Sequence, residues 1–305
     1  MVGIIVSVVI TFISYGKKIK RPETVSMIID SDSGNEIDDL FAISLAIIDP
    51  KIDLIGLSSA QWNMHPNATD SSVYVSQKIN EELLSLHDTL GIPHPLGASE
   101  QTGYWGDTKP RSSPAASFIL EEAKKLRYGK KLNVVTLGAV TNLATAIMTD
   151  TTIAKKIVWY GMALKYDNKT RVWDKNEFNV RNDLDAMDYL LNREGLETHI
   201  MTATTSRSLK LGKVETFDLI EGRGAEWDFL VDRWREVAPE SRDWIMWDLA
   251  LIQAIMNPDL VTEKEVSTPD ENVSRKIYAY TWMDEKKMKR EFWKLVRIHM
   301  GDMSN

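Results

Sequence analysis

VSMIIDSDSGNEIDDLFAISLAII, residues 25–48, is the stretch of sequence that most clearly indicates a fold. Residues 25–29 form a short apolar run that ends in acidic residues, as a buried parallel strand does. Apolar residues then recur at helical spacing over 37–48, and Asp49-Pro50 ends this pattern. A strand that leads through a polar loop into a helix is the repeating unit of an α/β protein.

The same alternation continues along the chain. Strands are expected at 52–58, 132–137, 157–162 and 199–204, and helices at 71–90, 115–126, 141–148 and 183–192. This order predicts an α/β fold in which a mostly parallel central sheet is flanked by helices, Rossmann-like and formed by a single domain over residues 23–305. Ligands of such sheets bind at the carboxyl ends of the strands, where polar residues stand here at 30–32, 61–63 and 138–142.

Bulk composition excludes several classes of function. The chain has 305 residues, of which 43% are hydrophobic and 27% charged, as in an ordinary globular protein. Its formal net charge of -7 gives no general affinity for nucleic acid or anionic membranes. It contains no cysteine, which excludes disulfides, zinc–thiolate sites and thiol nucleophiles and leaves the cellular compartment open.

The amino-terminal segment differs from the rest. Residues 2–15 are apolar and are followed by Lys17, Lys18, Lys20 and Arg21. Such a run is too short to span a bilayer, which takes about 20 residues. It suits the core of a signal peptide, although no basic residues precede it and no clear cleavage site follows. We expect residues 1–22 to be a signal-like or membrane-proximal segment that contacts a membrane or the export machinery. With such a segment, the chain would be exported, periplasmic or tethered to a membrane. Without it, the chain would be cytoplasmic.

Residues 30–39 hold five carboxylates, at positions 30, 32, 36, 38 and 39. Like charges this close raise one another's pKa and cost free energy unless a cation neutralises them. Mg²⁺ and Ca²⁺ both take such oxygen ligands. Capping of the following helix would explain one or two of the acids but not four. The cluster therefore predicts a metal site.

Four motifs together resemble those of the nucleoside hydrolases. Asp30-x-Asp32 followed by Asp38-Asp39 resembles the amino-terminal signature of that family, in its Asn-Glu-x-Asp-Asp version. Residues 133–144, which end in Thr-Asn-Leu-Ala, resemble its strand–turn–helix. Residues 177–183 resemble its Glu-Phe-Asn…Asp segment, and 247–250 its late His-Asp-Pro-Leu-Ala segment. Each motif is weak alone, but the four occur in the order of the family.

The resemblance implies the nucleoside hydrolase fold and calcium-dependent hydrolysis of the N-glycosidic bond of ribonucleosides, giving ribose and free base. By position, the calcium ligands would be Asp32, Asp39, Asp248 and the backbone carbonyl of Leu137, with Asp32 also the general base. A bound cation lowers the pKa of water, and a carboxylate can then take its proton. The members of the family are commonly dimers or tetramers, so a homo-oligomer is expected.

Ribose hydroxyls would be held by four further side chains, namely Asp38, Asn63, Glu177 and Asn179. Each candidate also has a structural alternative. Asn63 could be a turn residue of its loop, Asn179 could flank and cap a helix, and Asp248 could cap the helix that follows it. Asp30 is expected to support its neighbours through hydrogen bonds.

The departing base poses a separate question. Many members protonate it with a histidine directly before the late aspartate, where this chain has Trp247. A purine-preferring branch instead stacks the base between tryptophans, which predicts that Trp247 acts on the base and that purines are preferred. Its partner would come from the loop of residues 103–106, where Trp105 is preferred and Tyr104 is the alternative. The asparagine that usually precedes Glu-Phe-Asn is missing, and Asn168 and Asn176 are the candidates to replace it. These departures leave open whether the substrate is an ordinary nucleoside.

Two other functions compete with this interpretation. Residues 28–34 resemble the nucleophile strand of a haloacid-dehalogenase-type phosphatase, but the later lysine and acidic pair of that class are not in convincing places. A non-catalytic ribose- or sugar-binding relative is the second alternative. Retention of Asp32, Asp39 and Asp248 argues against it, because a binding protein has no need of a metal-held water.

Overall fold

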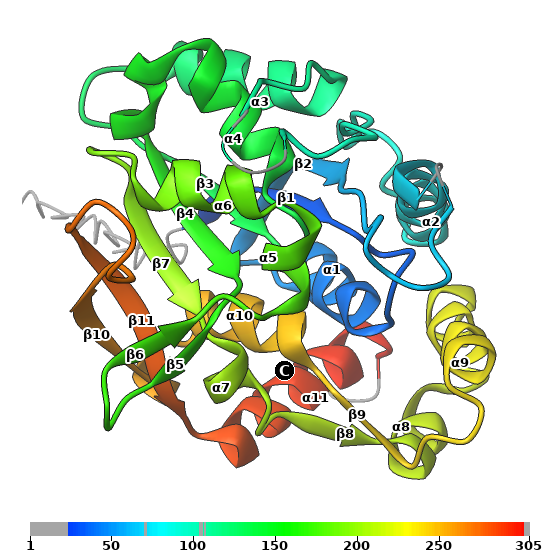
Figure 1. The fold of residues 1–305 in the computed structure, drawn as a ribbon. Helices are drawn as coiled ribbons and strands as arrows, with labels where there is room; N and C mark the ends of the chain where they lie inside the picture. Colours follow the sequence, from blue (N-terminus) through cyan, green and yellow to red (C-terminus); the bar gives the residue numbers. More distant parts are fainter. Residues whose placement is uncertain (1–23, 70–71, 104–105, 107, 302–305) are drawn as a thin grey trace, which may run out of the picture.

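A seven-stranded sheet runs through the centre of the protein, whose computed structural model describes residues 24–69, 72–103, 106 and 108–301 (Figure 1). The strand order is β10-β11-β7-β4-β3-β1-β2. Neighbouring strands are parallel, except that β10 at one edge is antiparallel to β11. In chain order the strands are β1 (Val25–Ser31), β2 (Ile52–Ser59), β3 (Leu132–Thr136), β4 (Ile157–Met162), β7 (Glu197–Met201), β10 (Val261–Ser267) and β11 (Lys276–Met283).

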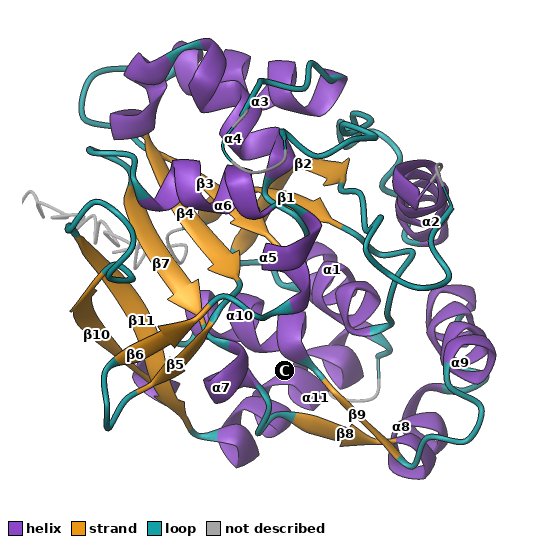
Figure 2. Ribbon diagram, viewed as in Figure 1, coloured by secondary structure: helices purple, strands orange, loops and turns teal. Residues whose placement is uncertain are grey.

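Helices cover both faces of this sheet (Figure 2). Successive side chains of a strand point to opposite faces, so Met27 and Ile29 of β1 lie in one apolar core and Ile28 lies in the other. The first core is closed by α1 (Asp38–Ile48), α2 (Ser72–Leu86), α9 (Ala225–Val237), α10 (Trp247–Met256) and α11 (Glu285–His299). The second is closed by α3 (Pro114–Lys125), α4 (Thr141–Thr149) and α6 (Leu184–Leu191).

Short elements complete the described chain. They are the hairpin of β5 (Lys165–Asp167) and β6 (Val172–Asp174), the pair β8 (Lys210–Gly212) and β9 (Asp243–Ile245), the helices α5 (Phe178–Asn182), α7 (Ala203–Ser206) and α8 (Lys213–Ile220), and the 3-10 turns η1 (Thr151–Lys156) and η2 (Pro258–Leu260). The hairpin β5–β6 lies beside the carboxyl ends of β4 and β7 (Figure 1).

The predicted fold class is confirmed, but most predicted boundaries shift by one or more residues, and the helix expected at 71–90 ends at Leu86. Two of these errors have a local cause. The strand expected at 199–204 ends at Met201, because the Thr202 side chain caps α7 by accepting a hydrogen bond from the backbone nitrogen of Thr205. The helix expected at 183–192 begins one residue later, because Asp183 is its N-cap and ends α5 at the same time. Both errors arise where a polar side chain stops a regular pattern.

The predicted segment 1–22 lies outside the described residues. Among the helices that the structure describes, none combines the length and the hydropathy needed to cross a bilayer. This finding covers the described residues only, so the prediction for residues 1–22 stays a prediction.

Four parallel strands end at the same edge of the sheet and bring distant residues together. Asp32 follows β1, Leu137 follows β3, Met162 ends β4, and Ala203 lies two residues past β7. All four line one pocket. The carboxyl edge of the sheet therefore carries the candidate site, as the strand order predicts.

Candidate active site

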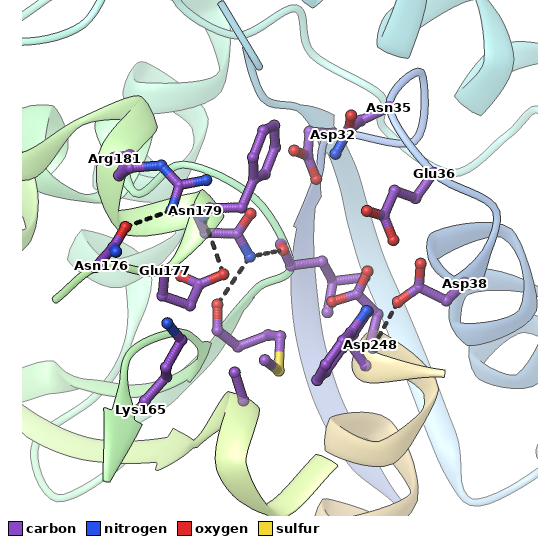
Figure 3. A pocket seen from close by; sticks show the side chains of 15 residues that line it. Asp32, Asn35, Glu36, Asp38, Lys165, Asn176, Glu177, Asn179, Arg181 and Asp248 are labelled. Carbon is purple, nitrogen blue, oxygen red and sulfur yellow. Dashed lines mark hydrogen bonds between the residues drawn. The ribbon is translucent and has the colours of Figure 1, made fainter. Parts of the chain in front are cut away.

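A pocket of about 240 Å³ opens at the carboxyl edge of the sheet (Figure 3). One side of it is acidic and is formed by the β1–α1 loop and the first turns of α1 and α10. The other side comes from the hairpin strand β5 and from α5 with the residue before it. Seven of the predicted site residues line the pocket, and Asp39 does not. The seven are Asp32, Asp38, Leu137, Glu177, Asn179, Trp247 and Asp248.

A cluster of three buried carboxylates lies at the acidic side. Asp38, Asp39 and Asp248 each offer one oxygen, and these oxygens lie within 4.8 Å of one another. The backbone nitrogen of Asp248 donates a hydrogen bond of 3.0 Å to Oδ2 of Asp38, so α1 and α10 meet at their amino-terminal ends. Both helix dipoles favour negative charge at that point. The fold thus concentrates carboxylates where two helices partly compensate their charge.

The pKa values of this cluster are raised. Burial, followed by the charge of Asp38, raises the pKa of Asp39 to about 7, although the Ser31 hydroxyl donates to its carboxylate. Burial is also the first cause that raises the pKa of Asp32 and Asp248 well above the usual value, and the charge of Asp39 is the second. Without a cation, these groups hold negative charge only at a cost in free energy.

Two oxygens of the cluster region have no partner. Oδ2 of Asp32 and Oδ1 of Asp38 are buried, and neither accepts a hydrogen bond. A buried polar atom without a partner costs about 1–3 kcal/mol, so such atoms commonly mark a ligand site. Several carboxylates together with a carbonyl form the donor set that a hard divalent cation prefers. The residues present therefore fit a divalent metal.

Asp32 lines the pocket from the end of β1 but is not part of the three-carboxylate cluster, which contains Asp38 in its place. Its carboxylate packs against the backbone at Gly138, where a Cβ atom would lie 2.7 Å from Cγ of Asp32. A glycine is thus required at 138 for Asp32 to keep this position. The neighbouring carbonyl of Leu137 accepts a hydrogen bond of 2.6 Å from Nδ2 of Asn179.

Glu177 and Asn179 belong to the first turn of α5. The Glu177 carboxylate caps this helix by accepting hydrogen bonds from the backbone nitrogens of Asn179 and Val180. Burial raises its pKa. Asn179 is therefore not the cap, since it lies inside the helix, and its amide also donates 2.9 Å to the carbonyl of Met162. It ties the ends of β3 and β4 to the pocket wall.

Asn63 is not brought to the pocket. It is exposed, its amide nitrogen donates to the carbonyl of Ser99, and its amide oxygen accepts from the Ser72 hydroxyl. The first bond joins its loop to the segment at Ser99 and the second joins it to the start of α2, so the side chain has a structural role. Asn35 lines the pocket instead, and its Oδ1 is buried without a partner. The β1–α1 loop thus supplies an amide that the Asn63 loop does not.

Trp247 lies half-buried in the pocket wall at the start of α10. Trp105, predicted as its partner, lies outside the described residues. The other loop tryptophans do not line the pocket. Trp62 is buried and donates to Ser76, and Trp173 donates to the carbonyl of Ser267.

Two residues of the four motifs, Asp30 and Asn142, have a structural role. Asp30 accepts hydrogen bonds from Ser58 (2.6 Å) and from the amide of Asn142 (3.0 Å), as expected of a supporting residue, and burial raises its pKa to about 7. Asn142 also donates to the carbonyl of Ser59 and accepts from the backbone nitrogen of Ala98. The Thr-Asn-Leu-Ala motif therefore joins strands and loops behind the pocket.

Sequence reasoning missed several residues of the lining, namely Asn35, Glu36, Met162, Lys165, Phe178, Arg181 and Ala203. Of the two asparagines weighed as replacements, Asn176 lines the pocket, whereas Asn168 accepts a hydrogen bond from Lys264 outside it. Glu36, Asn176 and Arg181 stand within or beside the recognised motifs, which could have indicated them. Nothing in the local sequence marks Lys165, because only the hairpin brings it to the site.

Comparison with known proteins extends over nearly the whole chain. The family model described as inosine-uridine preferring nucleoside hydrolase matches residues 27–297. Uridine nucleosidase 1 of Arabidopsis thaliana is 26% identical over 270 residues, which cover 78% of this chain and 76% of that protein.

Solved structures share the fold at lower identity. A plant nucleoside hydrolase superposes with a TM-score of 0.69 at 17% identity, covering 90% of this chain and 99% of that one. A purine-preferring ribonucleoside hydrolase from Gardnerella vaginalis gives 0.63 at 21% identity, covering 91% and 100%. With the match to the family model and the acidic pocket at the carboxyl edge, this chain belongs to the inosine-uridine preferring nucleoside hydrolase family and is a hydrolase of N-glycosyl bonds.

Proposed function

We propose that this chain uses calcium to hydrolyse ribonucleosides to ribose and free base, and that it prefers purine bases. The observation that carries the proposal is the cluster of Asp38, Asp39 and Asp248 beside two unpartnered carboxylate oxygens in the pocket. Family membership replaces the phosphatase as an interpretation, because the matched length is that of a nucleoside hydrolase.

The proposed calcium ligands are Asp32, Asp39, Asp248 and the carbonyl of Leu137. Calcium suits this set better than magnesium, since it accepts six to eight oxygens, carbonyls included, in irregular geometry. When bound, the cation would supply Lewis-acid chemistry, lowering the pKa of a water and gripping ribose hydroxyls. Asp38 belongs to the same cluster, and its unpartnered Oδ1 is available to a ribose hydroxyl.

Asp32 is the proposed general base. Its Oδ2 is buried in the pocket without a hydrogen-bond partner, so it can accept a proton from the attacking water. Glu177 and Asn179 face it from α5 and can bind ribose hydroxyls (Figure 3). Positive charge develops on the ribose as the glycosidic bond breaks, and the surrounding carboxylates stabilise it.

Trp247 supports a preference for purines. Its indole lines the pocket next to Asp248, where a flat bicyclic base could stack on it. Uridine is the second candidate, because relatives in Arabidopsis thaliana and rice are named uridine nucleosidases. The base preference is therefore a question for direct measurement.

Release of base and ribose by the purified protein tests the proposal. Inosine, adenosine, guanosine, uridine and cytidine are supplied with calcium and, in parallel, after EDTA treatment. Higher kcat/KM for the purine nucleosides and loss of turnover in EDTA are expected. Comparable kcat/KM for inosine and uridine would contradict the base preference. Full activity after EDTA treatment would contradict the role of calcium. Failure to release base from any of the nucleosides would contradict the proposed hydrolysis.

Assembly and location are further parts of the proposal. Members of the family are commonly dimers or tetramers, so we propose a homo-oligomer, which light scattering would detect. The apolar residues 2–15 support a contact with a membrane or the export machinery. Fractionation of cells that express the full chain would locate it.

A further inference from the structure

The pocket has two sides of opposite charge (Figure 3). Asp32, Glu36, Asp38 and Asp248 line one side. Lys165 of β5 and Arg181 of α5 line the other, with Glu177 between them (Figure 3). An uncharged nucleoside has no group that needs two cations. The cationic side therefore requires an explanation beyond the hydrolysis of a simple nucleoside.

Neither cation is fully neutralised by the protein. Lys165 pairs with Asp174 at 3.3 Å, but the two side chains are 44% and 52% exposed, and exposed pairs of this kind contribute little. Among the described carboxylates, none forms an ion pair with Arg181. Its guanidinium donates a hydrogen bond of 2.8 Å to the neutral side chain of Asn176.

Glu177 forms no ion pair with either cation among the described contacts. Burial raises its pKa, and the nearby charge of Arg181 only partly opposes that shift. Each of its carboxylate oxygens already accepts a hydrogen bond from a backbone nitrogen of α5. Lys165 and Arg181 therefore remain available to an anion at the rim of the pocket. Arginine can bind two oxygens of a phosphate at once, and lysine adds a compact point charge.

The chemistry of a nucleoside identifies where such an anion would be attached. If the vicinal hydroxyls of the ribose face the acidic side and the base lies at Trp247, the remaining substituent is the C5′ group. The C5′ group is bonded to C4′, and the base is bonded to C1′. These two carbons lie on opposite sides of the ring oxygen. In this orientation the C5′ group points away from the carboxylate cluster, toward the side that carries Lys165 and Arg181.

We propose that the preferred substrates of this enzyme are ribonucleoside 5′-monophosphates, whose phosphate is bound by Lys165 and Arg181. This inference rests on the proposed function, because it uses the same orientation of ribose. Water oxygen bonds to C1′, the C1′–N bond breaks with its electron pair on the base nitrogen, and one water proton passes to Asp32. The departing base gains a proton from solvent, Asp32 returns its proton to solvent, and the phosphate ester remains intact in ribose 5-phosphate.

Paired substrates test the proposal. Release of free base is measured for inosine and inosine 5′-monophosphate, and for uridine and uridine 5′-monophosphate, at low and high ionic strength. For the wild type, kcat/KM is expected to be at least about tenfold higher for the monophosphate, since hydrogen bonds to charged groups are strong. Its KM should rise with salt more than that of the nucleoside.

Three single substitutions assign the effect to residues. Lys165→Met and Arg181→Met should each lower the ratio of kcat/KM, monophosphate over nucleoside, about tenfold. Arg181→Lys should keep part of that ratio, because it retains the charge. Lys169→Met is the matched control, since Lys169 is an exposed lysine of the same hairpin that does not line the pocket. This control should leave the ratio at the wild-type value.

Each result decides the proposal. A ratio near or below one in the wild type would overturn it while leaving nucleoside hydrolysis established. A high ratio that Lys165→Met and Arg181→Met do not change would overturn the assignment of these residues. No free base from nucleoside or monophosphate would overturn this inference and the proposed function together.

Discussion

Asp32 shows how a single side chain depends on its immediate surroundings. It follows β1 directly, and its carboxylate packs against Gly138 of the neighbouring β3–α4 turn. Its Oδ2 is buried and unpartnered, although most buried oxygens in native proteins have a partner. The fold thus maintains a position that stability alone would not favour, which is typical of functional residues.

Replacement of this carboxylate tests its role. Asp32→Asn keeps the shape of the side chain but cannot accept a proton, so kcat should fall about 10²–10⁴-fold. Folding should persist, because the amide relieves like-charge repulsion within the cluster. Base release and circular dichroism would be compared with Asp53→Asn, which changes an exposed carboxylate of β2. Near wild-type turnover by Asp32→Asn would show that another group removes the proton.

At the scale of elements, the junction of α5 and α6 organises the loops around the site. Asp183 ends α5, caps α6 through the backbone nitrogen of Ala186, and accepts hydrogen bonds from the backbone and hydroxyl of Thr102 and from the hydroxyl of Thr141. One buried carboxylate therefore joins α4, α6 and the loop that contains Thr102.

Loss of this carboxylate should be costly. Asp183→Ala leaves several donors without a partner, so the free energy of unfolding should fall by about 2–4 kcal/mol. Asp185→Ala, in the first turn of α6, removes a side chain that among the described residues accepts one exposed hydrogen bond, from the backbone nitrogen of Gly106. It should change the free energy of unfolding by about 0.5 kcal/mol or less. Urea denaturation measures both. Equal effects of the two substitutions would show that the junction is not a centre of stability.

At the scale of the whole molecule, two apolar cores hold the sheet while the carboxylate cluster opposes folding. Asp39 shows in which direction pH changes the stability of the fold. Its pKa of about 7 in the folded protein lies above the unfolded value of about 3.9. The folded state thus binds more protons than the unfolded state between these values. Stability of the metal-free protein should therefore fall as pH rises from about 4 to 7.

Calcium should reverse this loss. Its binding requires deprotonated carboxylates, so the stabilisation it gives grows over the same pH range. At saturating calcium the melting temperature should rise by about 5–10 °C at pH 8 relative to EGTA, and by much less at pH 5. Thermal unfolding at both pH values measures this, with sodium chloride of equal ionic strength as the control. An equal shift at both pH values would show that calcium binds elsewhere.

The local pattern of the chain was sufficient for much of the fold. Residues 25–48 predict β1, the acidic loop and α1 correctly, because hydrophobic periodicity is a local property that tertiary packing reinforces. The motifs also predicted that Asp32, Asp39 and Asp248 would come near one another. In the structure Asp39 and Asp248 form a cluster with Asp38, and Asp32 lies near enough for the charge of Asp39 to raise its pKa after burial. The carboxyl-edge rule needs only the order of strands and helices.

Other features were decided by the tertiary structure alone. Lys165 reaches the pocket because a hairpin folds beside β4, and Asn63 stays away because its amide is hydrogen-bonded to Ser99 and Ser72. The break between α5 and α6 at Asp183 depends on the hydrogen-bond donors that surround its carboxylate. Periodicity and motifs report how residues near in sequence behave, whereas the charge on the far side of a pocket depends on segments that meet only when the chain is folded.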